Sequence, residues 1–289
     1  MDSKIQRIII IGERHSGTNF ISELVRSNLQ LRYAFHPLDF FTSIKCDDPW
    51  PPKHGYQTLK EPTPGGLSEP YEYNTSLAIV AFRNPWDWVL SMHRDCWCKD
   101  KLKHAAKTFE AFLTSRWQDN CPKPWLGETR RGSCRNILEC RAYKLQNYLN
   151  MTTWAPHVEF VNHERIHSTE GSLSWLKALV TKYNLDVREE GLRPIDHYTS
   201  APPITALRRT YNHEASEKTS VWFNQDQLRY NVTLRQMVAL VNKFMVQKEE
   251  LAAGYSVMEL PELESKDVDI NDEVHQVAVV AAMAVAEQH

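Results

Sequence analysis

The stretch RIIIIGERHSGTN, from Arg7 to Asn19, decides the fold class of this 289-residue chain. Four consecutive isoleucines, Ile8–Ile11, form an unbroken β-branched run that is typical of a parallel strand buried on both faces. Gly12 ends the run, and apolar residues then recur at helical spacing from Thr18 to Leu29. The sequence therefore predicts a strand, a short turn and a helix in direct succession.

The rest of the chain continues to alternate between strand and helix patterns. Two more apolar runs predict buried strands, Leu77–Phe82 (LAIVAF) and His157–Asn162 (HVEFVN). The expected later helices are Pro85–His93, Asn136–Asn150, Leu173–Tyr183 and a long one at Leu234–Ala253. This alternation predicts an α/β fold with a central, mostly parallel sheet.

One domain is expected over residues 1–258, before the acidic segment that begins at Glu259. Residues 34–76 hold seven prolines and predict a long excursion with little regular structure. Residues 95–135 are polar and Trp-rich and are interpreted as an insertion in the domain. Residues 259–289 are expected to form an acidic linker followed by a short C-terminal helix or a disordered tail.

The charge balance limits the partners. The chain has 34 Lys and Arg against 36 Asp and Glu, a formal net charge of -2, which offers no sequence-wide cationic surface for nucleic acid or anionic lipid. No apolar run is long enough for a signal peptide core or a membrane span. We therefore expect a cytoplasmic protein with no nucleic-acid partner and no membrane attachment.

The same expectation decides how the six cysteines are interpreted. In a reducing compartment they are predicted to be free thiols rather than a disulfide framework, and their clustering leaves a zinc or redox role open. They are Cys46, Cys96, Cys98, Cys121, Cys134 and Cys140.

The turn after the first strand is a candidate anion-binding loop. Gly12 and Gly17 have the G-x-x-x-x-G spacing of a phosphate loop at a helix N-terminus, where backbone N–H groups and the helix dipole favour an anion. Thr18 and Asn19 stand where a nucleoside triphosphatase has Lys and then Ser or Thr. The second strand runs into Arg83 and has no terminal Asp, which disfavours a magnesium-bound triphosphate.

A second motif completes the pattern. The segment VAFRNPWDWVLS is a strand that ends in Arg83, with Ser91 eight residues later on the following helix. Together with His15-Ser16-Gly17-Thr18 it resembles the motifs of sulfotransferases that use 3'-phosphoadenosine 5'-phosphosulfate. The sequences GERHSGTN and RNPWDWVLS are similar to those of a subset of bacterial and algal sulfotransferase-like proteins. The resemblance covers roughly residues 5–165 and implies a P-loop NTPase-like, three-layer α/β/α fold.

The resemblance assigns roles to both motifs. It implies that Arg83 and Ser91 bind the 3'-phosphate, since a guanidinium fork and a hydroxyl are suitable donors. It implies that the loop binds the 5'-phosphosulfate through Ser16, Gly17, Thr18 and Asn19. A cation there would stabilise charge on the leaving phosphate oxygen. The family has Lys or Arg immediately before Ser-Gly-Thr, whereas this chain has His15, preceded by Arg14; either Arg14 supplies the charge, or the ligand keeps His15 cationic.

The acceptor's proton requires a base within hydrogen-bond reach. In the family this is a His or Glu from the segment after the first helix, so the candidates are His36, Asp39, His54 and Glu61. His54 is our first choice because Lys53-His54-Gly55 resembles an element of the same subset of relatives. Lys53 is expected to attract the donor or steady the transferring group.

Three further charged residues are candidates for the site or its support. Arg141 and Lys144 either add positive charge to the site or lie on a solvated helix face. Glu164 is expected to be structural.

The resulting hypothesis is a sulfotransferase that needs no metal. It moves the sulfuryl group of 3'-phosphoadenosine 5'-phosphosulfate to a hydroxyl or amine of a small-molecule or carbohydrate acceptor and leaves adenosine 3',5'-bisphosphate. Two alternatives are a P-loop kinase-like nucleotide enzyme and a non-catalytic descendant that binds an anion or a partner.

Overall fold

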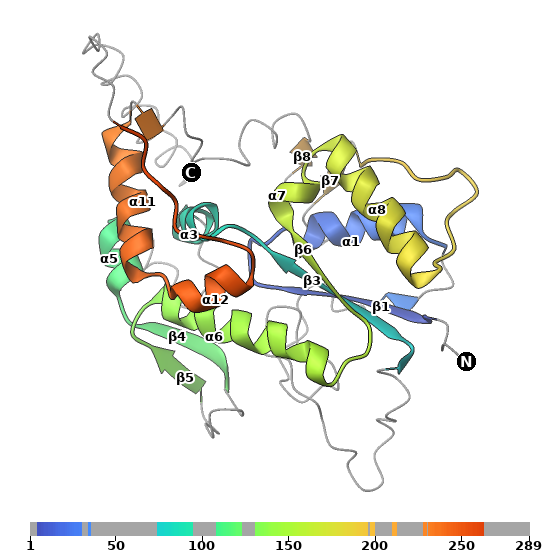
Figure 1. Cartoon of the computed structure of the whole chain (residues 1–289), viewed down its shortest axis with the longest axis horizontal. Helices are drawn as coiled ribbons and strands as arrows, with labels where there is room; N and C mark the ends of the chain where they lie inside the picture. Colours follow the sequence, from blue (N-terminus) through green and yellow to red (C-terminus); the bar gives the residue numbers. More distant parts are fainter. Residues whose placement is uncertain are drawn as a thin grey trace, which may run out of the picture.

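A four-stranded, wholly parallel sheet forms the centre of the fold (Figure 1). The computed structural model describes residues 5–30, 34–35, 74–94, 108–122, 131–195, 197–199, 210–212, 228–229 and 231–262. The strand order is β2-β1-β3-β6. The strands are β1 (Arg7–Gly12), β2 (Ala34–Phe35), β3 (Ser76–Phe82) and β6 (Val158–Asn162). The predicted α/β class with a mostly parallel sheet is confirmed.

Helices follow the strands along the chain. They are α1 (Thr18–Asn28), α3 (Pro85–Arg94), α5 (Phe109–Thr114), α6 (Ile137–Leu149), the 3-10 helix η2 (Asn150–Thr153), α7 (His163–Ile166), α8 (Thr169–Tyr183), α11 (Val232–Phe244) and α12 (Gln247–Ala252). Two antiparallel hairpins stand outside the main sheet. They are β4 (Trp117–Pro122) with β5 (Arg131–Cys134), and β7 (His197–Thr199) with β8 (Thr210–Asn212).

Both faces of the sheet are covered, because the side chains of each strand point alternately to opposite sides. Ile8, Leu77 and Ile79 pack on one face with apolar residues of α1 and α8. Ile9 and Val80 pack on the other face with apolar residues of α6. Figure 1 shows the sheet running between these two groups of helices. Burial on both faces explains why the strands are continuous apolar runs.

The carboxyl ends of β1, β3 and β6 lie at one edge of the sheet. Gly12 pairs with Ala81, and Phe82 pairs with Asn162. The chain leaves β1 through α1 to reach β2 on one side, while β3 lies on the other side of β1. The strand order therefore reverses between β1 and β3, and ligands of open α/β sheets bind at such a reversal.

The prediction of one long helix at Leu234–Ala253 is wrong. The chain forms two helices, because Met245 and Val246 are both extended, the first as the C-cap of α11 and the second as the N-cap of α12. The break turns α12 so that Glu250 reaches α6, as described below. Neither Gly nor Pro stands at Met245 or Val246, so no local helix-breaking signal marks this break in the sequence.

Three smaller features of the structure also differ from the predictions made from the sequence. The two-residue strand β2 lies in the segment expected to have little regular structure. Helix α8 begins at Thr169, earlier than predicted, because the Ser168 side chain accepts a hydrogen bond from the N–H of Gly171. Cys134 and Cys140 form a disulfide between β5 and α6, which corrects the prediction that all six cysteines are free thiols.

Within the described ranges no helix combines the length and apolarity needed to cross a membrane; the apolar segment 274–286 lies outside them.

Candidate functional site

The turn between β1 and α1 is a tight loop with two left-handed residues. Gly17 has φ 84° and caps α1 without a side-chain hydrogen bond, while His15 has φ 61°. Ser16 is fully buried, and both its N–H and its hydroxyl donate to the Glu13 carbonyl, at 3.2 and 2.7 Å. A non-glycine residue in this conformation costs about 1–2 kcal/mol, and such residues cluster at functional sites.

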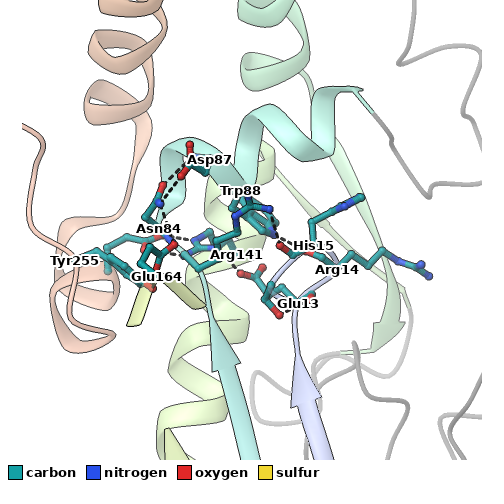
Figure 2. Close-up of polar contacts among 12 residues, drawn as sticks. Glu13, Arg14, His15, Asn84, Asp87, Trp88, Arg141, Glu164 and Tyr255 are labelled. Carbon is teal, nitrogen blue, oxygen red and sulfur yellow. Dashed lines mark hydrogen bonds and ion pairs between the residues drawn. The ribbon is translucent and has the colours of Figure 1, made fainter. Parts of the chain in front are cut away.

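Two side chains of the neighbouring segment fix the backbone of this loop (Figure 2). The indole N–H of Trp88 donates to the Arg14 carbonyl at 2.8 Å. Arg83 Nη1 donates to the His15 carbonyl at 3.2 Å. With these carbonyls held, the side chains of Arg14 and His15 point away from the buried polar groups in Figure 2. These two hydrogen bonds hold the loop backbone against the end of β3 and α3, and the two basic side chains of the loop point outward.

Arg83 and Ser91 meet directly. Arg83 Nη1 lies 3.1 Å from Ser91 Oγ, because Arg83 follows β3 and Ser91 sits two turns along α3. Arg83 Nε is buried, and neither a hydrogen-bond acceptor nor a carboxylate partner is found for it among the described residues. The charge of Arg83 is thus not neutralised by a described acidic group, which suits it to binding an anion.

Arg141 has the opposite character. Its side chain is fully buried and forms ion pairs with Glu13 at 2.6 Å and Glu250 at 2.5 Å. Burial alone would lower the pKa of Arg141, but the carboxylates of Glu250 and Glu13 outweigh burial and raise that pKa above its usual value. The alternative of a solvated helix face is wrong for Arg141, and its charge is already matched by two carboxylates. Lys144 is half-buried on the same helix.

A second polar network secures the turn after Arg83. Asn84 caps α3 by accepting from the Asp87 N–H at 2.8 Å, and its amide donates back to Asp87 at 2.7 Å. Glu164 accepts from the backbone N–H of Asn84 at 2.8 Å and from the hydroxyl of Tyr255 at 2.8 Å. Burial, followed by the charge of Glu164, raises the pKa of Tyr255 above its usual range. These contacts agree with the structural role expected for Glu164.

His163 packs against the loop from the end of β6. A methyl group added to Gly17 would overlap its imidazole, and the ring makes an edge contact with Phe20 at 6.4 Å between centroids. Burial, followed by the charges of Arg83 and His167, lowers the pKa of His163 from its usual value to about 3. His163 is therefore a neutral imidazole beside Arg83 at neutral pH.

The structure brings most of the predicted residues to one edge of the sheet. Arg83 and Ser91 lie beside the loop that holds the other six, which are Arg14, His15, Ser16, Gly17, Thr18 and Asn19. The predicted base His54, its neighbour Lys53, and the other base candidates His36, Asp39 and Glu61 lie outside the described residues.

Sequence reasoning missed the residues that hold this edge together, namely Glu13, Trp88, His163 and Glu250. One local signal was available beside them, since Asn84-Pro-Trp-Asp87 has the spacing of a helix cap, but it marks Asn84 and Asp87 rather than these four residues. The ion pairs of Arg141 span 128 and 109 positions, so no local pattern marks them.

In this arrangement the guanidinium of Arg83 lies beside the N-terminus of α1, where the basic side chains of Arg14 and His15 point outward. This arrangement can therefore bind a ligand with two anionic groups. Comparison of the chain with protein-family models, with curated proteins and with solved structures finds no match.

Proposed function

We propose that this chain is a sulfotransferase with a P-loop NTPase-like α/β/α fold, using 3'-phosphoadenosine 5'-phosphosulfate as donor and a hydroxyl or amine of a small molecule or carbohydrate as acceptor. The observation that carries the proposal is the double contact of Arg83 Nη1, with Ser91 Oγ at 3.1 Å and with the His15 carbonyl at 3.2 Å. This guanidinium joins the two motifs that the family resemblance assigns to the two ends of one nucleotide.

The described residues fit such a donor. Arg83, whose charge is not paired with a carboxylate among the described residues, and Ser91 would bind the 3'-phosphate. The first N–H groups of α1, whose cap supplies no side-chain acceptor, would bind the 5'-phosphate. The Ser16 hydroxyl donates to the Glu13 carbonyl, so the backbone N–H groups and Thr18 are the better donors in this conformation. The strained His15 is consistent with a loop shaped for binding rather than for stability.

When bound, the donor supplies a sulfuryl group: its S–O bond to the phosphate breaks with the electron pair left on the phosphate oxygen, and an S–O or S–N bond forms to the acceptor. Arg14 or His15 would stabilise the charge that accumulates on that phosphate oxygen, since both side chains point outward from the loop (Figure 2). His54 remains the proposed base that takes the acceptor's proton.

A direct test measures transfer of labelled sulfate from the donor to a panel of sugars, phenols, alcohols and amines. The wild-type chain is expected to label at least one acceptor, and Arg83→Ala is expected to abolish labelling at low donor concentration. Arg135→Ala is the control, because Arg135 is an exposed arginine paired only with Glu139 among the described residues. Transfer that survives Arg83→Ala unchanged would refute the assigned donor site.

A further inference from the structure

Arg141 joins four parts of the chain at one buried point. Its Nη1 binds the Glu13 carboxylate of the loop at 2.6 Å, and its Nη2 donates to the backbone carbonyl of Arg83 at 2.6 Å. Its Nε binds Glu250 of α12 at 2.5 Å, and its guanidinium stacks over the Trp88 ring at 4.7 Å. Figure 2 shows Arg141 between the end of β3 and the Glu13 side chain.

Stability alone does not require this arrangement. A buried ion cluster is often no more stabilising than apolar residues that fill the same space, because desolvation offsets the attraction. The guanidinium has a different property, since its planar donors bind several partners at fixed angles. Here those partners are the loop and the strand end that carries Arg83, while Glu250 accepts from Nε and Nη2.

We propose that Arg141 is a positioning residue that sets the spacing between the phosphate loop and Arg83, and hence between the two anion sites of the donor nucleotide. This inference rests on the proposed function. A ligand with two anionic ends gains affinity from binding both at once only if the sites are held at the right separation. Arg141 touches neither anion; it acts through Glu13 and through the backbone of Arg83.

The test compares three ligands by calorimetry on the full chain, namely adenosine 3',5'-bisphosphate, adenosine 5'-monophosphate and adenosine 3'-monophosphate. Arg141→Lys keeps the charge but cannot reach Glu13, Glu250 and the Arg83 carbonyl together. Glu13→Gln weakens only the link to the loop and leaves the pair with Glu250, so it decides the question if the lysine variant does not fold. Arg135→Lys is the matched control, because its side chain is 87% exposed.

In the wild type and in Arg135→Lys, the bisphosphate is expected to bind much more tightly than either monophosphate. In Arg141→Lys and Glu13→Gln, its affinity should fall at least about tenfold, while each monophosphate loses less than about threefold. Parallel losses for all three ligands, or no loss, would overturn the positioning role and leave the proposed function standing. A wild-type chain that binds the bisphosphate no better than the monophosphates would overturn the proposed function itself.

Discussion

Arg83 donates a hydrogen bond from Nη1 to the hydroxyl oxygen of Ser91, 3.1 Å away and eight residues further along the chain. The same nitrogen reaches the carbonyl of His15, which lies 68 residues earlier in the loop after β1. The contact is possible because β1 and β3 are parallel neighbours, so the segments that follow them emerge at the same edge of the sheet. The Arg83 side chain thus contacts both motifs, although they are far apart in the sequence.

The first prediction concerns the 3'-phosphate. Ser91→Ala removes one hydroxyl and should weaken binding of adenosine 3',5'-bisphosphate about fivefold to tenfold, whereas Arg83→Ala should weaken it at least about thirtyfold, as expected for charged hydrogen bonds. Calorimetric titration measures both effects. Adenosine 5'-monophosphate is the control ligand, since it lacks the 3'-phosphate and its affinity should change little. Equal losses for both ligands would contradict the assignment.

The second prediction concerns the loop backbone. Gly17 and Gly191 both have left-handed φ values, 84° and 78°, but only at Gly17 would a methyl group overlap a neighbour, the imidazole of His163. Gly191→Ala should therefore cost about 1 kcal/mol of backbone strain, and Gly17→Ala about 2 kcal/mol more. Urea unfolding of the two variants gives the difference. Equal destabilisation would show that His163 is not packed against Gly17.

The third prediction concerns the buried ion cluster. Arg141→Met leaves the carboxylates of Glu13 and Glu250 buried without their cation and should lower the free energy of unfolding by about 3–5 kcal/mol. Arg135→Met removes an exposed cation from its pair with Glu139 and should cost less than about 1 kcal/mol. Thermal and urea unfolding compare the two matched substitutions. A loss for Arg141→Met as small as that of Arg135→Met would contradict the described burial.

The fourth prediction is a pH dependence. The pKa of His163 is about 3 in the folded chain and about 6.5 in an unfolded one, so only the unfolded chain takes up this proton between those values. The stability contribution is complete above pH 6.5 and is lost as the pH falls, by about 2 kcal/mol between pH 6.5 and pH 5. His163→Gln should remove that part of the slope. Between pH 7.5 and 8.5, the difference in unfolding free energy between the wild type and His163→Gln should not change with pH. If that difference also stayed unchanged from pH 7.5 down to pH 5, the prediction would be contradicted.

Local patterns were sufficient to predict three strands of the main sheet and the proximity of Arg83 and Ser91. The isoleucine run of β1 and the apolar run of β3 predict neighbouring buried strands, and the eight-residue spacing predicts that Ser91 lies near Arg83. Each of these features depends on residues that are close in the sequence, where periodicity is informative. The contact of Arg83 with the His15 carbonyl is not local, because it requires β1 and β3 to be neighbours.

Patterns were insufficient where the structure depends on distant partners. Arg141 looked equally suited to solvent or to a ligand, because Glu13 and Glu250 are 128 and 109 residues away. The break at Met245 and Val246 contains neither Gly nor Pro and so has no local signal, although it is what brings Glu250 to Arg141. His163 carries no sequence signal of its own, since its neutrality comes from burial beside Arg83.

The measurement that tests the central claim most directly is calorimetric titration of the full chain with adenosine 3',5'-bisphosphate in the presence of a metal chelator, beside a titration with ATP and magnesium. A sulfotransferase donor site predicts that the bisphosphate binds without metal and at least about a hundredfold more tightly than ATP with magnesium, because Arg83 and Ser91 recognise a 3'-phosphate that ATP lacks. Tight magnesium-dependent binding of ATP, or no measurable binding of the bisphosphate, would contradict it.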